Sequence, residues 1–112
     1  NHMKIDISQS GDVHVLAFEG NLDTTTSPEA ERQINELIDG GASNLLVNFD
    51  QLNFIASSGL RVLLATAKKL GPAAGTLRIC GLNATVQEVF DISGFGTILN
   101  VSKTQEDALA EF

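Results

Sequence analysis

The sequence contains neither tryptophan nor tyrosine, and it has only two prolines and one cysteine in 112 residues. A single cysteine excludes an internal disulfide and is typical of a reducing compartment, so we expect a cytoplasmic protein. Six phenylalanines are the only aromatic residues, which predicts a mainly aliphatic core. No apolar run reaches the length of a membrane span, and we recognise no signal peptide, so we expect no membrane partner.

Basic residues are also scarce, with seven Lys and Arg against 14 Asp and Glu and a formal net charge of −7. They occur singly apart from Lys68-Lys69, so the sequence lacks the basic patch that nucleic acids or anionic membranes require. The length and the 43% hydrophobic content suit one core. We therefore expect a single domain over residues 3–112, preceded by an expression scar at residues 1–2, and no nucleic-acid partner.

The apolar pattern predicts strands that alternate with helices after an opening hairpin. Strand-like segments lie at residues 4–9, 13–19, 45–49, 76–80 and 98–101, and helical patterns follow the last four of them. This order predicts an α/β fold: a mixed, mostly parallel sheet of about five strands, with an N-terminal antiparallel hairpin and about four helices. We expect most helices to lie on one face, with a thinner cover on the other.

Polar residues that can cap helices precede each predicted helix. Ser27 comes before Pro28, which predicts an N-cap followed by proline at the first helical position. Ser57 or Ser58 is expected to cap the helix that ends at Leu70, and Asn83 and Thr104 to cap the last two.

The serine pair has two interpretations. The first is a structural cap. The second is a regulatory phosphorylation site, because a phosphate of about −1.5 to −2 charge suits the positive end of a helix and repels a docked partner. Both interpretations stay open at this stage.

Signatures of catalysis are missing from the sequence. It contains no glycine-rich phosphate loop and no Gly-x-Ser-x-Gly elbow. His14, the only histidine outside the scar, is interpreted as a packed strand residue, and Cys80 as a small core residue. We expect a protein that is not an enzyme and that has no metal site and no cofactor.

Three separated segments resemble one known family. Residues 54–60 (Phe-Ile-Ala-Ser-Ser-Gly-Leu) resemble the hallmark of STAS domains, specifically the bacterial anti-sigma factor antagonists. Residues 19–23 (Glu-Gly-Asn-Leu-Asp) resemble the Gly-Glu-Leu-Asp loop of that family, and residues 89–95 (Val-Phe-Asp-Ile-Ser-Gly-Phe) resemble its Phe-Asp-x-Ser-Gly-Leu segment. The resemblance runs from Met3 to Phe112 with the same order of elements.

The resemblance implies a bacterial partner-switching regulator of a sigma factor, and thereby of transcription. Such a protein binds an anti-sigma factor serine kinase, is released when that kinase phosphorylates it, and is reset by a serine phosphatase. The implied phosphoacceptor is Ser57, and Asp23 is the implied kinase-contacting acid. The implied partner-binding residues are Asn21, Asp23, Thr24, Ala56, Ser58, Gly59 and Leu60. We expect a monomer or a weak dimer.

The sequence departs from the family pattern at two positions. Ala56 stands where the family usually has Asp, and Asn21 stands where its loop has Glu. Two alternatives therefore accompany the switching function. One is a non-switching STAS scaffold subunit of a stressosome-like or lipid-transport complex, and the other is a small-ligand or nucleotide-binding STAS module.

Overall fold

A computed structural model describes residues 2–112, apart from the side chain of Ala73. The strands are β1 (Met3–Ser10), β2 (Val13–Leu22), β3 (Asn44–Ile55), β4 (Thr76–Cys80) and β5 (Asn100–Ser102). The α-helices are α1 (Ser27–Asp39), α2 (Ser57–Leu70), α3 (Ala84–Ser93) and α4 (Gln105–Leu109). Two short 3-10 helices complete the chain, η1 (Gly71–Ala73) and η2 (Phe95–Thr97).

The strands form one sheet in the order β1-β2-β3-β4-β5. β1 pairs antiparallel with β2, and every later pair is parallel. The carboxyl ends of β2, β3 and β4 therefore meet at one edge of the sheet, and α1, α2 and α3 follow them along the chain. In an open α/β sheet this edge is where binding sites form.

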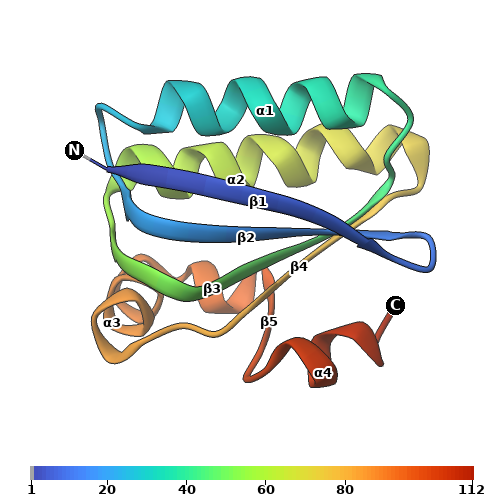
Figure 1. Cartoon of the computed structure of the whole chain (residues 1–112). Helices are drawn as coiled ribbons and strands as arrows, with labels where there is room; N and C mark the ends of the chain where they lie inside the picture. The colour runs from blue at the N-terminus through green and yellow to red at the C-terminus, as the bar shows by residue number, and fades with distance from the viewer. Residues whose placement is uncertain (1) are drawn as a thin grey trace.

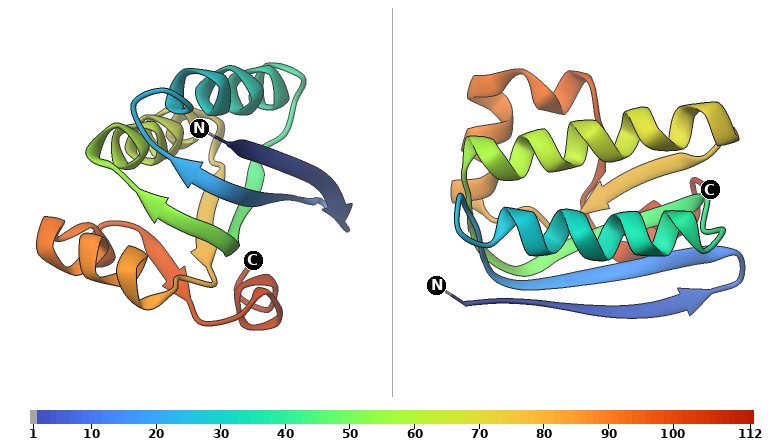
Figure 2. Two further views of the ribbon diagram at one scale, coloured as in Figure 1. Left: turned by 60° about the vertical axis from the view of Figure 1, so that its left-hand side comes forward. Right: turned by 90° about the horizontal axis from the view of Figure 1, so that it is seen from above.

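Helices α1 and α2 lie side by side on one face of the sheet, and α4 lies on the other side (Figures 1 and 2). The alternation of the strands explains the division. Leu45 and Val47 of β3 point into the main core with α1 and α2, whereas Leu46 packs with Cys80 and with Ala108 of α4. The short helix α4 thus gives its face a thinner cover than α1 and α2 give the opposite face.

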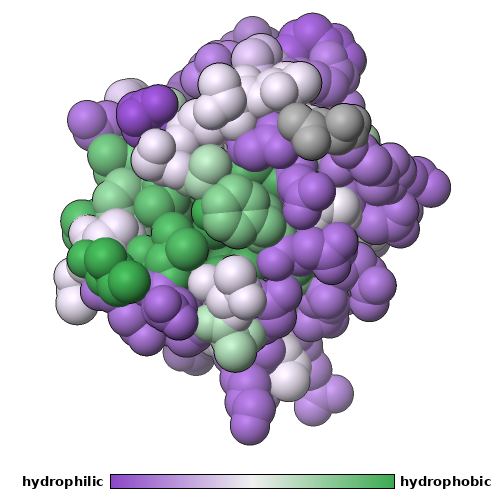
Figure 3. All heavy atoms as spheres, turned by 90° about the vertical axis from the view of Figure 1, so that its left-hand side faces the viewer, coloured by the Kyte–Doolittle hydropathy of each residue, from purple (hydrophilic) through white to green (hydrophobic). Residues whose placement is uncertain are grey.

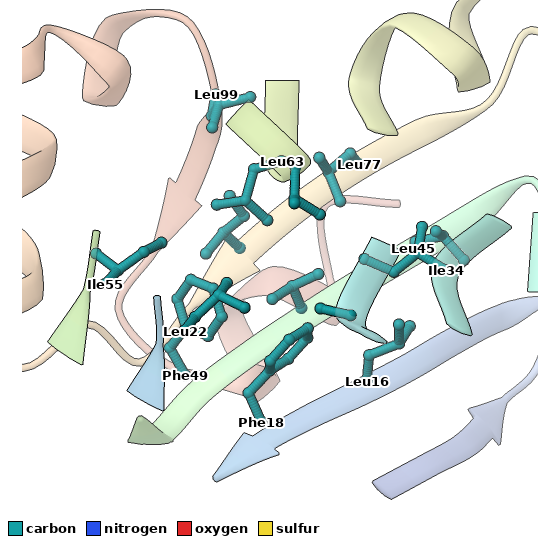
Figure 4. Close-up of a cluster of buried hydrophobic side chains, with 14 of the residues drawn as sticks. Leu16, Phe18, Leu22, Ile34, Leu45, Phe49, Ile55, Leu63, Leu77 and Leu99 are labelled. Carbon is teal, nitrogen blue, oxygen red and sulfur yellow. The ribbon is translucent and has the colours of Figure 1, made fainter. Parts of the chain in front are cut away.

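The main core gathers side chains from β2, β3, α1 and α2 (Figure 4). At its centre the rings of Phe18 and Phe49 pack edge to face, with 5.3 Å between their centroids. Leu22, Ile55 and Leu63 are fully buried and bring this core up to the carboxyl edge of the sheet. The first turn of α2 therefore packs against buried apolar side chains.

The structure confirms the predicted fold class and corrects several boundaries. β2 and β3 run on to Leu22 and Ile55, beyond the predicted ends at residues 19 and 49, because the two strands keep pairing across two register shifts. The last strand starts at Asn100 rather than residue 98, since η2 occupies the approach to it. Phe54 lies in the part of β3 beyond the predicted strand and is 42% exposed, while its neighbour Ile55 is buried.

The cap predictions are confirmed for two helices and wrong for two. Asn83 Oδ1 accepts a hydrogen bond from Val86 N at 2.8 Å, and Thr104 Oγ1 accepts one from Asp107 N at 3.1 Å. Ser27 and Ser57 are instead the first residues inside their helices. The cap positions of α1 and α2 belong to Thr26 and Ala56, and neither makes a side-chain cap bond.

Candidate functional site

Two segments that are far apart in the sequence meet at the carboxyl edge of the sheet. Leu22 and Ile55 are paired in register, and Ala56 N donates to Leu22 O at 2.9 Å. The loop that follows β2 therefore lies beside the start of α2. This pairing brings Asp23 and Ser57, both predicted as site residues, to the same edge of the molecule.

Ser57 occupies the first position of α2 with its side chain exposed. Within residues 2–112 we find no hydrogen bond made by its hydroxyl. The preceding residue, Ala56, is half-buried and extended, with φ −98° and ψ 173°, and it has no acceptor with which to cap the helix. Ser57 Oγ is thus neither a cap nor part of the core, and it faces solvent at the positive end of the helix.

Ser58 is placed differently from its neighbour. Its side chain is half-buried, and its hydroxyl accepts a hydrogen bond of 3.3 Å from Ser27 Oγ. Ser27 is itself only 5% exposed at the start of α1. The second serine of the pair therefore links the amino ends of α1 and α2, and the first remains accessible.

Gly59 and Leu60, which the resemblance gives as partner-binding residues, are buried and lie beneath the exposed surface. A Cβ added at Gly59 would lie 2.8 Å from Leu22 Cγ and 2.8 Å from Ile55 Cγ1. Only a residue without a side chain lets α2 approach the ends of β2 and β3 this closely. Both residues support the site from beneath.

Asp23 organises the loop between β2 and α1. Its Oδ1 accepts hydrogen bonds from the backbone N–H groups of Thr25 and Thr26, at 3.0 and 3.1 Å. Thr26 Oγ1 accepts a bond of 2.9 Å from Asp23 N and donates one of 2.8 Å to Asn21 O. Asp23 and Asn21 are half-buried, and Thr24 is exposed. Asp23 Oδ1 thus stabilises the loop, and none of the hydrogen bonds found within residues 2–112 involves Asp23 Oδ2.

Helix α2 carries only basic charges. Its sequence, Ser-Ser-Gly-Leu-Arg-Val-Leu-Leu-Ala-Thr-Ala-Lys-Lys-Leu, contains no acidic residue, although the whole chain has a net charge of −7. Lys69 pairs with Asp39 at 3.1 Å. Arg61 and Lys68 line a groove between α1 and α2, together with Ser27, Ser58 and other side chains. A basic groove thus begins beside the serine pair.

Apolar side chains gather on the face at which α1 and α2 begin, with hydrophilic residues around them (Figure 3). Phe54, three residues before Ser57, is 42% exposed, and Ile92 of α3 is 80% exposed. Exposed apolar area on a small protein often marks a contact surface. Neither residue was predicted to lie on a contact surface, because an apolar residue in a strand or an amphipathic helix is assigned to the core by default.

The two other residues singled out in the sequence lie beside the first half of β3, where His14 pairs with Leu45 and Cys80 pairs with Asn48. Cys80 is fully buried, and burial, aided by the charge of Asp50, raises the pKa of its thiol to about 11. His14 is half-buried on β2, and its Nδ1 finds no hydrogen-bond partner among residues 2–112. Within the same residues, no three His, Cys, Asp or Glu side chains are grouped to hold a metal. None of the helices there has the length and apolar character needed to cross a membrane.

The chain is thus a small α/β domain with an accessible serine at the start of α2, at the carboxyl edge of a mixed five-stranded sheet. The chain belongs to the STAS domain family, whose family model matches residues 4–108. It is 32% identical over 110 residues to BtrV of Bordetella bronchiseptica, a protein named as a candidate anti-sigma factor antagonist, and the match covers 98% of this chain and 95% of BtrV.

Solved structures agree with this assignment. An anti-sigma factor antagonist from Mycobacterium paratuberculosis superposes with a TM-score of 0.90 at 23% identity, over 98% of this chain and 93% of that one. The phosphorylated form of the Bacillus cell fate determinant SpoIIAA superposes with a TM-score of 0.73 at 25% identity, over 96% of this chain and 98% of that one. At 23% identity, the likeness to the Mycobacterium paratuberculosis structure concerns the fold alone.

Proposed function

We propose that this protein is an anti-sigma factor antagonist that acts by partner switching in the bacterial cytoplasm. The unmodified protein binds an anti-sigma factor that is a serine kinase, and phosphorylation of Ser57 by that kinase releases it. A serine phosphatase restores the binding form. The observation that carries the proposal is the exposed, unbonded hydroxyl of Ser57 beside the Asp23 loop, in a chain of the STAS family.

The position of Ser57 explains how one modification can control binding. The phosphate adds about −1.5 to −2 charge at pH 7. Phe54 and Ile92 expose apolar surface on neighbouring elements, and a partner that covers this surface would have to desolvate the new charge. Like charges set across an interface cost several kcal/mol, which is on the order of a thousandfold in affinity.

Ser57 is favoured over Ser58 as the acceptor because the two hydroxyls differ in access. A kinase must bring the γ-phosphate of ATP in line with an acceptor oxygen. Ser57 is exposed, whereas Ser58 is half-buried and bonded to Ser27. We assign Asp23, Asn21, Thr24, Ala56 and Ser58 to the surface that the kinase contacts, with Gly59 and Leu60 beneath it.

The relatives support this assignment of function. BtrV is named as a candidate anti-sigma factor antagonist, and SpoIIAA exists in a phosphorylated form. In this proposal the protein is a substrate and a binding partner, not an enzyme. The kinase supplies ATP and the catalytic groups, and this chain supplies the acceptor and the docking surface.

The test is a phosphorylation assay with the anti-sigma serine kinase of the same organism. Wild type, Ser57→Ala and Ser58→Ala are incubated with kinase and ATP, and phosphate is located by mass spectrometry. We expect wild type and Ser58→Ala to gain one phosphate at residue 57 and Ser57→Ala to gain none. A kinase that binds the wild type without modifying it would refute the switch and favour the non-switching scaffold, for which Ala56 in place of Asp is the motivating observation.

A further inference from the structure

We propose that Arg61 receives the phosphate of phosphorylated Ser57, one helical turn away on the same face of α2. This inference rests on the proposed function, since it concerns the modified form of the same residue. Residues four apart on a helix have Cβ atoms about 5–6 Å apart, and a long side chain leans toward the turn that precedes it. The spacing therefore places Arg61 where its side chain can reach a phosphate on Ser57.

The surroundings of Arg61 leave it available for this contact. Its side chain is exposed, and we find no ion pair to it within residues 2–112. Glu31 of α1 lines the same groove, yet no contact within 4.0 Å joins its carboxylate to Arg61. α2 itself offers no acid with which Arg61 could pair. Ser58, which lies next to Ser57 and is tied to Ser27, lines the groove together with Arg61.

The chemistry of the pair favours binding. A guanidinium presents parallel N–H donors that match phosphate oxygens, and hydrogen bonds between charged groups are stronger than neutral ones. An acidic group four residues before a basic one is also the favourable orientation on a helix. Phosphorylation would then change two features together: it adds a dianion three residues after Phe54, and it engages Arg61, for which we find no ion pair within residues 2–112.

The experiment measures the second pKa of phosphoserine directly. Phosphoserine is installed at position 57 by genetic-code expansion, so that no kinase is needed, and its phosphorus NMR signal is titrated against pH. The ordinary second pKa is about 6. We expect Arg61→Gln to raise the second pKa of the phosphate by about 0.3 pH units, which corresponds to the strength of a solvent-exposed charge pair four residues apart on a helix. Arg61→Lys should raise this pKa less. The rise should vanish in 1 M salt, where charges are screened within about 3 Å.

Matched variants distinguish a direct contact between Arg61 and the phosphate from the overall electrostatic potential of the groove. Lys68→Gln removes a cation from the same groove nearly two turns further along α2, and we expect it to leave the phosphate pKa unchanged. Glu31→Gln removes a nearby carboxylate and should lower that pKa, as should Asp23→Asn in the adjacent loop.

Two results would overturn the inference. One is an unchanged phosphate pKa in Arg61→Gln, and the other is an equal rise in Arg61→Gln and Lys68→Gln. A kinase that leaves Ser57 unmodified would refute the proposed function and would not affect this titration. The two failures are therefore distinguishable.

Discussion

Replacing Gly59 with alanine tests whether this residue serves packing or contact. The new Cβ would lie 2.8 Å from both Leu22 Cγ and Ile55 Cγ1, closer than carbon atoms approach without displacement. Both neighbours are fully buried, so neither can swing into solvent. Overpacking of a tight core costs about 1–3 kcal/mol. Alanine in place of glycine in a helix returns up to about 1 kcal/mol.

The overpacking cost and the propensity gain can be separated with Ala65, an exposed residue in the interior of α2. Ala65→Gly removes an exposed methyl group and measures the propensity difference between alanine and glycine in this helix. We expect the loss of stability in Gly59→Ala, with that difference added, to be about 1–3 kcal/mol in urea unfolding monitored by circular dichroism. A sum near zero would refute the packing role and return Gly59 to the contact surface.

Three further predictions concern the site and the core. Ser57→Asp should weaken binding to the anti-sigma kinase by at least tenfold in calorimetric titration, while Ser58→Ala should leave the affinity within about threefold. Equal affinities for wild type and Ser57→Asp would exclude an electrostatic switch. Asp23→Asn keeps an acceptor for the Thr25 and Thr26 amides and should retain stability while it weakens kinase binding, whereas Asp23→Ala should lose about 1 kcal/mol of stability as well. Burial raises the pKa of the Cys80 thiol to about 11, so Cys80 should react with a thiol reagent at pH 8 at least about tenfold more slowly in the native protein than in guanidinium. Equal rates would contradict its burial.

The sequence predicted the fold well because its signals are local and agree with one another. Alternation in β1, the apolar run of β3 and the amphipathic pattern of α2 each allow one structure, and their order leaves few topologies. The boundaries that failed have a common cause. Leu22 and Ile55 sit in polar segments that resemble loops, and only the pairing of β2 with β3 makes strands of them.

The details of the site depend on contacts that no sequence pattern contains. A serine before an apolar helical run predicts a cap equally well at Ser57 or Ser58. The structure assigns the cap position to Ala56, because the extended backbone that ends β3 continues through that residue. The bond between Ser58 and Ser27 joins two residues that are 31 positions apart in the chain, and it gives Ser58 a different role from the adjacent Ser57.

The same contacts bear on how a phosphate could act without unfolding the protein. Every side chain beneath the first turn of α2 is already packed or bonded: Gly59 against Leu22 and Ile55, and Ser58 against Ser27. Ser57 is the exposed residue of this turn, so a phosphate on its hydroxyl displaces no packed group. A modification at Ser58 would break the bond to Ser27 and force charge between two helices, which costs folding energy. A switch that must be reversed many times is therefore better built on Ser57, where the free-energy change falls on the partner and not on the fold.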